Sequence, residues 1–310
     1  MDVESLKELQ KSIIKKNKRF NLIIVVTLIS VIGLSVYIML LKKASIFLLP
    51  FVSIGEFIII FAILSIVKMA STRKDVETFN KEYKNIFVLK ELKDIFKDLE
   101  YKPEKGFSEE DVDKIGILDT GDSFESNDYI SGKYKGIKFE QSDLFIQEMV
   151  EEEDADGETD EVWRTIFLGS LMVFDFNKNF KSNIQVFSRG FDAISFSTGE
   201  KYTNIKMEDS DFNNKFFVFA QNEHEAFYIL TPNFMEKIKE ITKKLNSSVM
   251  YAFVDNKLYI AVDNFKDAFE WNVLKPIDEQ KIKENINKDI KVITDFVDEL
   301  NLNNDLFKTK

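Results

Sequence analysis

Glu56 carries the carboxyl group with the most unusual sequence position, because it lies midway along a long apolar run. An ionised carboxylate is costly inside a bilayer, so such a residue marks a proton or cation pathway by default. Ser53 lies one helical turn away on the same face, and Ser30 of the preceding apolar run is expected at a similar depth. Glu56 then either handles protons or cations in an oligomer, or it is a protonated acid hydrogen-bonded to Ser30. We favour the second interpretation, which contributes about 1 kcal/mol or less to helix packing.

A second candidate carboxylate is Asp119, in the sequence Ile-Leu-Asp-Thr-Gly at 117–121. An apolar pair before Asp-Thr-Gly resembles the aspartic proteases, in which two such aspartates share one proton because like charges so close cannot both ionise. One copy per chain implies a homodimer, and an apolar-apolar-Gly follows at 167–169. Asp-Thr-Gly is also good turn chemistry between strands. We favour the turn, and a membrane-anchored aspartic-type hydrolase using Asp119 stays the alternative.

The residue types give little support to metal or cofactor chemistry. The chain has no Cys and a single histidine, His224, which excludes thiolate ligands, cysteine nucleophiles and histidine clusters. The acidic stretch 148–161 fails the EF-hand pattern, because Gly157 comes four residues into the loop instead of six. We predict no cofactor and no metal site, a surface position for His224, and a long solvated hairpin loop at 148–161.

Two apolar runs near the N-terminus indicate where the chain is anchored. Residues 20–41 and 44–67 are each long enough to cross a bilayer core of ~30 Å at ~1.5 Å rise per helical residue. Two lysines separate them, which predicts a tight antiparallel transmembrane hairpin. Cations are concentrated in residues 1–19 and again at 68–74, so the positive-inside rule places both termini of this two-span cell-membrane protein in the cytoplasm. Residues 1–19 are predicted to form a basic amphipathic helix on the inner membrane face.

The charge of the chain changes sign after the apolar runs. Residues 1–74 carry eleven cations and four anions, a net charge of +7, and the whole chain carries −11, so the remainder carries −18. The basic end favours anionic lipid headgroups. The acidic remainder argues against nucleic-acid binding, which needs cations that neutralise phosphates.

The rest of the chain has the periodicity of an α+β domain. Apolar residues recur at three- and four-residue steps, which predicts a membrane-proximal helix over 68–102 that Pro103 ends. Segments rich in β-branched and aromatic residues follow, and the last two form a hairpin at 249–262. Residues 276–310 are predicted as an amphipathic helix and tail. The fold class is therefore α+β: a two-helix transmembrane hairpin, then a mixed, mainly antiparallel β domain at 103–275 with flanking amphipathic helices.

Several blocks of residues together resemble a known family. They lie at 165–169, 175–180, 212–220, 225–235 and 258–261, and include Asp-Phe-Asn-Lys and Tyr-Ile-Leu-Thr-Pro. In this order, after a basic N-terminus and two apolar runs, they are similar to the bacterial domain-of-unknown-function family 3137. The resemblance implies a membrane-anchored protein without an assigned activity, and it implies a LemA-type membrane protein as a partner. It supplies no catalytic residues.

From the sequence we expect a membrane-tethered, non-catalytic interaction domain that acts in the cytoplasm as a scaffold or sensor for another membrane or envelope component. The lipid bilayer is its first partner, and homo-oligomers are compatible with the pattern. Thirty Phe residues give surplus apolar surface, which favours a binding site.

Overall fold

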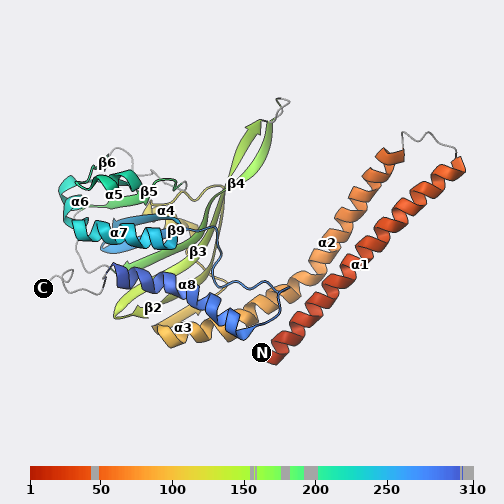
Figure 1. Cartoon of the computed structure of the whole chain (residues 1–310), viewed down its shortest axis with the longest axis horizontal. Helices are drawn as coiled ribbons and strands as arrows, with labels where there is room; N and C mark the ends of the chain where they lie inside the picture. Colours follow the sequence, from red (N-terminus) through yellow and green to blue (C-terminus); the bar gives the residue numbers. More distant parts are fainter. Residues whose placement is uncertain are drawn as a thin grey trace. The chain divides into compact units, whose positions relative to one another are not determined.

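The structure, a computed structural model, describes residues 1–42, 49–153, 157, 159–175, 182–191, 202–300 and 302, without the side chains at 35, 38–42 and 49–57. The chain divides into two compact units, Met1–Phe87 with Trp271–Ile282, and Val88–Glu270 with Lys283–Lys310. Figure 1 labels most of their elements. The helices are α1 (Val3–Lys42), α2 (Leu49–Tyr83), the π-helical turn η1 (Lys84–Val88), α3 (Leu89–Ile95), α4 (Glu109–Ile115), α5 (Ser210–Lys215), α6 (Glu223–Ile229), α7 (Pro232–Leu245) and α8 (Glu279–Glu299). The strands are β1 (Lys97–Lys102), β2 (Ser123–Tyr134), β3 (Ile137–Glu153), β4 (Thr159–Asp175), β5 (Ile184–Ser188), β6 (Thr203–Asn204), β7 (Phe216–Ala220), β8 (Ser248–Val254) and β9 (Lys257–Asp263).

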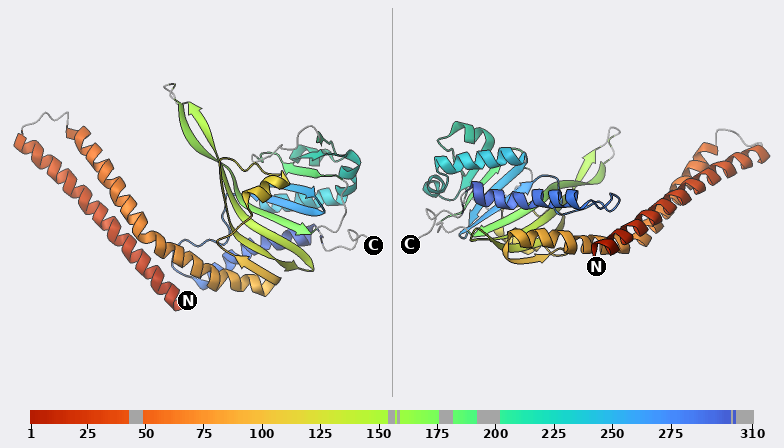
Figure 2. Two further views of the ribbon diagram at one scale, coloured as in Figure 1. Left: turned by 180° about the vertical axis from the view of Figure 1, so that it is seen from behind. Right: turned by 60° about the horizontal axis from the view of Figure 1, so that its bottom comes forward.

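The N-terminal unit is built on the long helices α1 and α2. Lys16 Nζ lies 2.5 Å from the Asp75 carboxylate, and Lys68 Nζ donates to Asn21 Oδ1 at 2.8 Å. Higher residue numbers in α1 therefore lie beside lower residue numbers in α2. The two helices are antiparallel neighbours, as both views in Figure 2 show.

α1 is one continuous helix, so the predicted division between residues 1–19 and 20–41 is not a break in the backbone. Its first half buries Leu6 and Ile13 in the protein. Gln10 Nε2 donates to the carbonyl oxygens of Val273 and Lys275, at 3.0 and 2.6 Å. The apolar side that was expected on the membrane surface is therefore covered by the chain itself.

One helix in the described part of the chain, Val3–Leu34, is long and apolar enough to cross a membrane by length and composition. None of its apolar window is buried in the protein. The second predicted span, 44–67, begins outside the described residues, and α2 contains the rest of it. The described structure thus contains an antiparallel helix pair with one candidate span, and a two-span hairpin is not shown.

The second unit contains a nine-stranded antiparallel sheet with the strand order β1-β2-β3-β4-β9-β8-β5-β7-β6. β4 joins the two parts of this sheet, because it pairs with β3 on one side and with β9 on the other. β8 and β9 form the predicted hairpin, with Asp255 and Asn256 at φ of 48° and 64°. Two consecutive positive φ values are what a two-residue type I′ hairpin turn requires. The prediction of an α+β fold with a large antiparallel β region is confirmed.

The predicted helix over 68–102 extends too far. The helix ends at Ile95, Phe96 is extended, and residues 97–102 form the edge strand β1 against β2. Leu99 and Tyr101 are half-buried and alternate with exposed charged residues, so a period of two is present beneath the helical one. Pairing with β2 decides between the two periods, because tertiary contacts override a weak local propensity.

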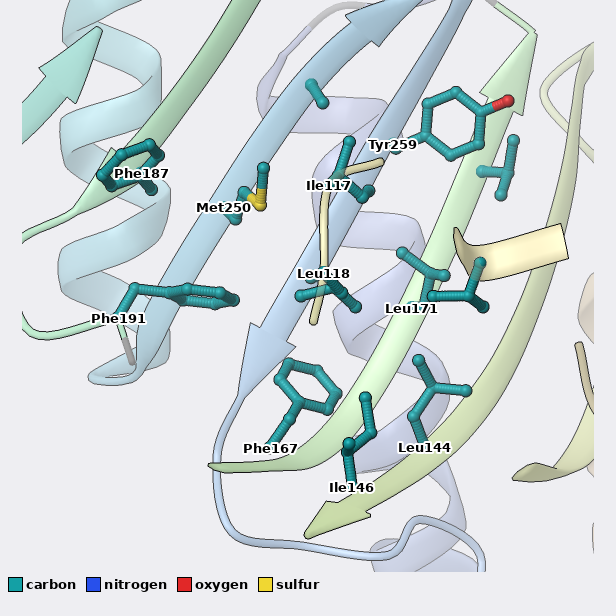
Figure 3. Packing of buried hydrophobic residues seen from close by; sticks show 14 of the residues in the cluster. Ile117, Leu118, Leu144, Ile146, Phe167, Leu171, Phe187, Phe191, Met250 and Tyr259 are labelled. Atoms are coloured by element: carbon teal, nitrogen blue, oxygen red, sulfur yellow. The ribbon is translucent and has the colours of Figure 1, made fainter. Parts of the chain in front are cut away.

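Both faces of the sheet bury apolar side chains. On one face Ile117 and Leu118, which follow α4, pack with Ile146, Phe167 and Leu171 from β3 and β4 (Figure 3). The turn after α4, which contains Ile117 and Leu118, thus covers the core on this face of the sheet.

Helices α7 and α8 cover the opposite face. The Phe234 ring of α7 lies 6.0 Å from Phe253 of β8, and the Phe296 ring of α8 lies 6.2 Å from Tyr251, centroid to centroid. Since successive strand residues point to opposite faces, Tyr251 and Phe253 face these helices while their neighbours in β8 face the Ile117 cluster.

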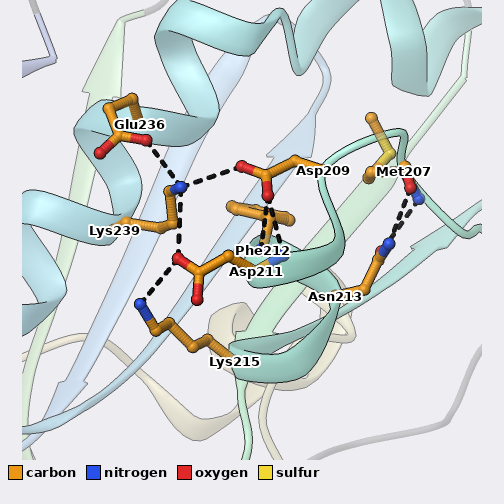
Figure 4. A network of polar contacts seen from close by, with 8 residues as sticks. All are labelled: Met207, Asp209, Asp211, Phe212, Asn213, Lys215, Glu236 and Lys239. Atoms are coloured by element: carbon orange, nitrogen blue, oxygen red, sulfur yellow. Dashed lines mark hydrogen bonds and ion pairs between the residues drawn. The ribbon is translucent and has the colours of Figure 1, made fainter.

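A polar network ties α7 to α5 (Figure 4). Lys239 of α7 lies 2.6 Å from Glu236, 2.9 Å from Asp209 and 3.4 Å from Asp211. The hydrogen bonds to Glu236 and Asp209 raise the pKa of Lys239 above its ordinary value. The three carboxylates all contact the Lys239 ammonium group, so we assign this network a structural role.

The β4–β9 contact gives a stability test at Gly169, where a Cβ would lie 1.9 Å from the Val262 carbonyl oxygen. We expect Gly169→Ala to lower the free energy of unfolding by about 1–3 kcal/mol, because backbone rather than a flexible side chain must move. Urea unfolding of the full chain in detergent, followed by tryptophan fluorescence, measures this change. Gly33→Ala is the control, since nothing lies within 4 Å of its Cβ position. Equal stability of both variants would contradict the close contact.

Candidate functional site

The structure places Asp119 in the turn between α4 and β2. Its side chain is exposed, and its Oδ1 accepts the backbone N–H of Gly121 at 2.9 Å. Gly121 has a φ of +60°, and its Cβ position lies 2.4 Å from the Gln147 carbonyl oxygen, so the turn requires glycine there. Asp-Thr-Gly therefore has the geometry of turn chemistry. The homodimeric hydrolase, which needs a second chain, stays a prediction.

The intramembrane polar residues are only partly described. Ser30 Oγ donates to the Val26 carbonyl oxygen within α1 at 2.8 Å. Ser53 and Glu56 belong to α2, but their side chains lie outside the described residues. The contact between Ser30 and Glu56 thus stays a prediction. His224 is exposed at the start of α6, as the sequence indicates.

Three carboxylates that the sequence did not single out converge in the second unit. Asp128, Asp143 and Asp267, called here the carboxylate centre, have oxygens within 4.8 Å of one another. Asp143 lies on β3 opposite Ser170 of β4, and Asp267 follows β9. Asp128 occupies the β2 position where the register with β3 shifts, and its φ of 52° is left-handed. Such a bulge re-aims a side chain, which brings Asp128 toward the β3 carboxylate.

The two carboxylates on the sheet are almost fully buried and tightly held. Ser170 Oγ lies 2.6 Å from Asp143 Oδ1, and the Ala268 N–H donates to Asp143 Oδ2 at 2.6 Å. The Tyr101 hydroxyl donates to Asp128 Oδ1 at 2.5 Å. Burial raises the pKa of Asp143 well above its ordinary value of 3.8, and the charges of Asp128 and Asp267 raise it further, against the Ser170 hydrogen bond.

The chemistry that fits these contacts is the storage of a proton. Carboxylates this close and this buried do not all ionise together, and the raised pKa of Asp143 favours its protonated form. A hard divalent cation also takes carboxylate oxygens. Ser170 and the Ala268 N–H donate to the two Asp143 oxygens, and burial and the charges of Asp128 and Asp267, not these contacts, favour the protonated form.

The sequence held a weak signal for this centre. Its three aspartates are 15 and 124 residues apart, and no short motif covers them. Glu140, however, begins four consecutive polar residues within a strand-like segment, and the last three of them are Gln141-Ser142-Asp143. All three are buried, and Gln141 Oε1 and Ser142 Oγ have no hydrogen-bond partner among the described residues.

The acidic stretch 148–161 is mostly strand, which corrects the prediction of a long solvated loop. Residues 148–153 of β3 pair in register with 159–164 of β4, and we call these two segments the acidic ribbon. Beyond the pairs Ser123↔Gln147 and Gly169↔Asp263, no further strand joins them in the described residues. A register shift at Ile146 marks the point where the ribbon leaves the sheet (Figure 1). The prediction failed because carboxylates are poor strand formers, and long-range pairing decided the structure instead.

The fold defines the class of the protein as α+β, with a long apolar N-terminal helix and a large antiparallel sheet. Residues 165–302 match the family described as Protein of unknown function (DUF3137), which confirms the family expected from the sequence blocks. The match begins within β4 and ends after α8, so it includes Asp267 but not Asp128 or Asp143. No curated protein and no solved structure matches the chain. Most of the block at 175–180 lies outside the described residues.

The carboxylate centre predicts a pH dependence of stability. A carboxyl group whose pKa is raised on folding binds its proton more tightly in the folded state. Its stabilising contribution is therefore complete below the ordinary pKa of 3.8 and is lost as the pH rises through the raised pKa. Asp143→Asn keeps the shape of the protonated acid, so the free energy of unfolding of this variant should fall less with rising pH than that of the unmodified chain.

Urea unfolding between acidic and neutral pH measures this slope. Asp113→Asn, at an exposed position of α4, is the control and should keep the original slope. The titratable groups around Asp143, namely Asp128, Asp267 and Tyr101, are unchanged in both variants. Identical slopes for Asp143→Asn and the unmodified chain would exclude a proton on Asp143.

Proposed function

We propose that this protein is a membrane-anchored interaction protein, a scaffold or sensor, whose helices α1 and α2 cross the bilayer as a hairpin and hold the α+β domain in the cytoplasm. The observation that carries the proposal is the apolar part of α1, none of which is buried in protein. Apolar surface of that length needs another apolar environment, and a bilayer core supplies it.

The packing of α2 supports the second crossing. α2 is antiparallel to α1, and its Ile59, Ile63 and Ile66 are exposed along its length. At one end of this apolar surface Lys68 of α2 donates to Asn21 of α1. A lysine at the end of a span can extend its ammonium group to the interface while its methylenes stay apolar. Asn21 and Lys68 therefore mark the level at which both helices enter the bilayer.

The orientation of the helix pair in the membrane follows from the cations of α1 that precede its apolar part. Lys11, Lys15 and Lys18 are exposed and recur at four- and three-residue steps on α1, opposite the buried face of Leu6 and Ile13. A row of cations just before a span favours the cytoplasmic side and its anionic lipids. Both termini then lie in the cytoplasm.

The interaction role draws on the acidic ribbon, which extends strand pairs beyond the sheet and exposes apolar side chains. Exposed apolar residues on a projecting element favour contact with a partner. A LemA-type membrane protein, implied by the family resemblance, is the first partner to test by cross-linking in native membranes.

The topology can be measured directly, because the chain contains no cysteine. We expect Lys43→Cys, in the two-lysine connection between the two predicted spans, to react with a membrane-impermeant maleimide in intact cells. Ser5→Cys and Ser210→Cys, at exposed positions of the two units, should react only after permeabilisation. Labelling of Ser5→Cys in intact cells would show that the N-terminus lies outside, which is the opposite of the proposed orientation. Labelling of all three from outside would contradict anchoring by a cytoplasmic-facing hairpin.

A further inference from the structure

We propose that the acidic ribbon is a docking surface for a cationic amphipathic segment of a partner protein, one rich in lysine or arginine and carrying an apolar side chain. The inference rests on the proposed interaction role and specifies the chemistry of the partner. Four features of the ribbon support it: its charge, the placement of that charge across the strands, its isolation from the sheet, and its exposed aromatic residue.

The ribbon and its connection concentrate negative charge. Residues 148–164 contain nine carboxylates and one cation, Arg164. Arg164 Nε already donates to Glu148 at 2.7 Å, its cross-strand neighbour. The single cation is thus engaged at the base of the ribbon, and the carboxylates nearer the tip are matched by no cation among the described residues.

The strand register places like charges directly opposite each other. Glu151 pairs with Glu161, and Glu152 pairs with Asp160. Opposed like charges destabilise a strand pair, and a two-stranded ribbon outside a larger sheet is only marginally stable by itself. The opposed carboxylates therefore lower the stability of the ribbon when no partner is bound. A bound cationic segment removes the repulsion and so stabilises the ribbon as it binds.

One face of the ribbon combines an apolar patch with these acids. Met149 and Trp163 are register partners and are 42 % and 51 % exposed. Since strand residues two apart share a face, Glu151 and Glu161 lie next to this pair on the same side. An ammonium or guanidinium group over the indole gains a cation–π contact while the adjacent carboxylates neutralise it. Met149 adapts its shape to an apolar side chain of the partner.

This combination selects against the other charged surfaces in a cell. Anionic lipid headgroups and nucleic-acid phosphates are repelled by the ribbon's charge. A small cation satisfies the carboxylates but leaves Met149 and Trp163 exposed. A cationic segment with an apolar residue satisfies both halves of the face.

The test uses the full chain in phosphatidylcholine nanodiscs with Trp271→Phe, which leaves Trp163 as the one tryptophan. Phenylalanine preserves the ring that stacks on Tyr83. The probe is a synthetic amphipathic Lys/Leu peptide, and we expect a saturable blue shift of Trp163 fluorescence that weakens with salt. A peptide of equal charge with Ser in place of Leu should bind more weakly, because it lacks the apolar contact.

Two variants with the same charge change separate ribbon binding from general attraction. Glu151→Gln, Glu152→Gln, Asp160→Asn and Glu161→Gln together should weaken peptide binding at least about tenfold, or 1.4 kcal/mol. The control replaces exposed acids outside the ribbon by Gln, at Glu109, Glu125, Glu208 and Glu240. Control binding should equal that of the parent.

Equal binding by the ribbon variant and the control would overturn the proposal. A fluorescence change with Ca²⁺ alone, or with phosphatidylglycerol vesicles alone, and none with the peptide would also overturn it. The cysteine-labelling pattern does not depend on the ribbon. A failure of peptide binding with the expected labelling would therefore reject this docking surface while leaving the membrane-anchored interaction role in place.

Discussion

The pairing of β4 with both of its neighbours is the constraint on which the rest of the second unit depends. β4 is 17 residues long, and it connects the β1-β2-β3 part of the sheet to the β9-β8-β5-β7-β6 part. Its contact with β9 is so close at Gly169 that a side chain would meet the Val262 carbonyl oxygen. Fixing β4 also fixes Ser170 against Asp143, and it sets the register in which Glu161 faces Glu151. Core, carboxylate centre and ribbon thus share one strand register.

The sequence predicted the features that depend on local order. The β8–β9 hairpin, predicted at 249–262, follows from a two-residue turn between apolar runs. The long apolar helix α1 follows from composition alone. These signals lie within a few neighbouring residues, so a single chain is enough to see them.

Features that depend on long-range pairing were predicted wrongly or missed. Residues 97–102 carry both a helical and a strand period, and only β2, more than 25 residues later, selects the strand. The described carboxylates at 151–153, 160 and 161 are exposed, as their residue type suggests, but their residue type hides the strand pairing that β3 and β4 impose. The carboxylate centre needs the β2 bulge, the β3–β4 register and the segment after β9 at once. No periodicity in one stretch of sequence contains that information.

The carboxylate centre and the ribbon use negative charge in opposite ways along the same two strands. Asp143 is buried, and its low-polarity surroundings raise its pKa and so favour its protonated form. Glu148, five residues further along β3, is half-buried and begins a segment whose later carboxylates, at 151–153, are exposed. At ~3.3 Å per residue, five residues of strand span about 17 Å, about twice the screening length of ~8 Å at physiological salt. Direct charge repulsion between them is therefore weak. What the two regions share is the β3–β4 pairing, which places Asp143 opposite Ser170 and Glu151 opposite Glu161.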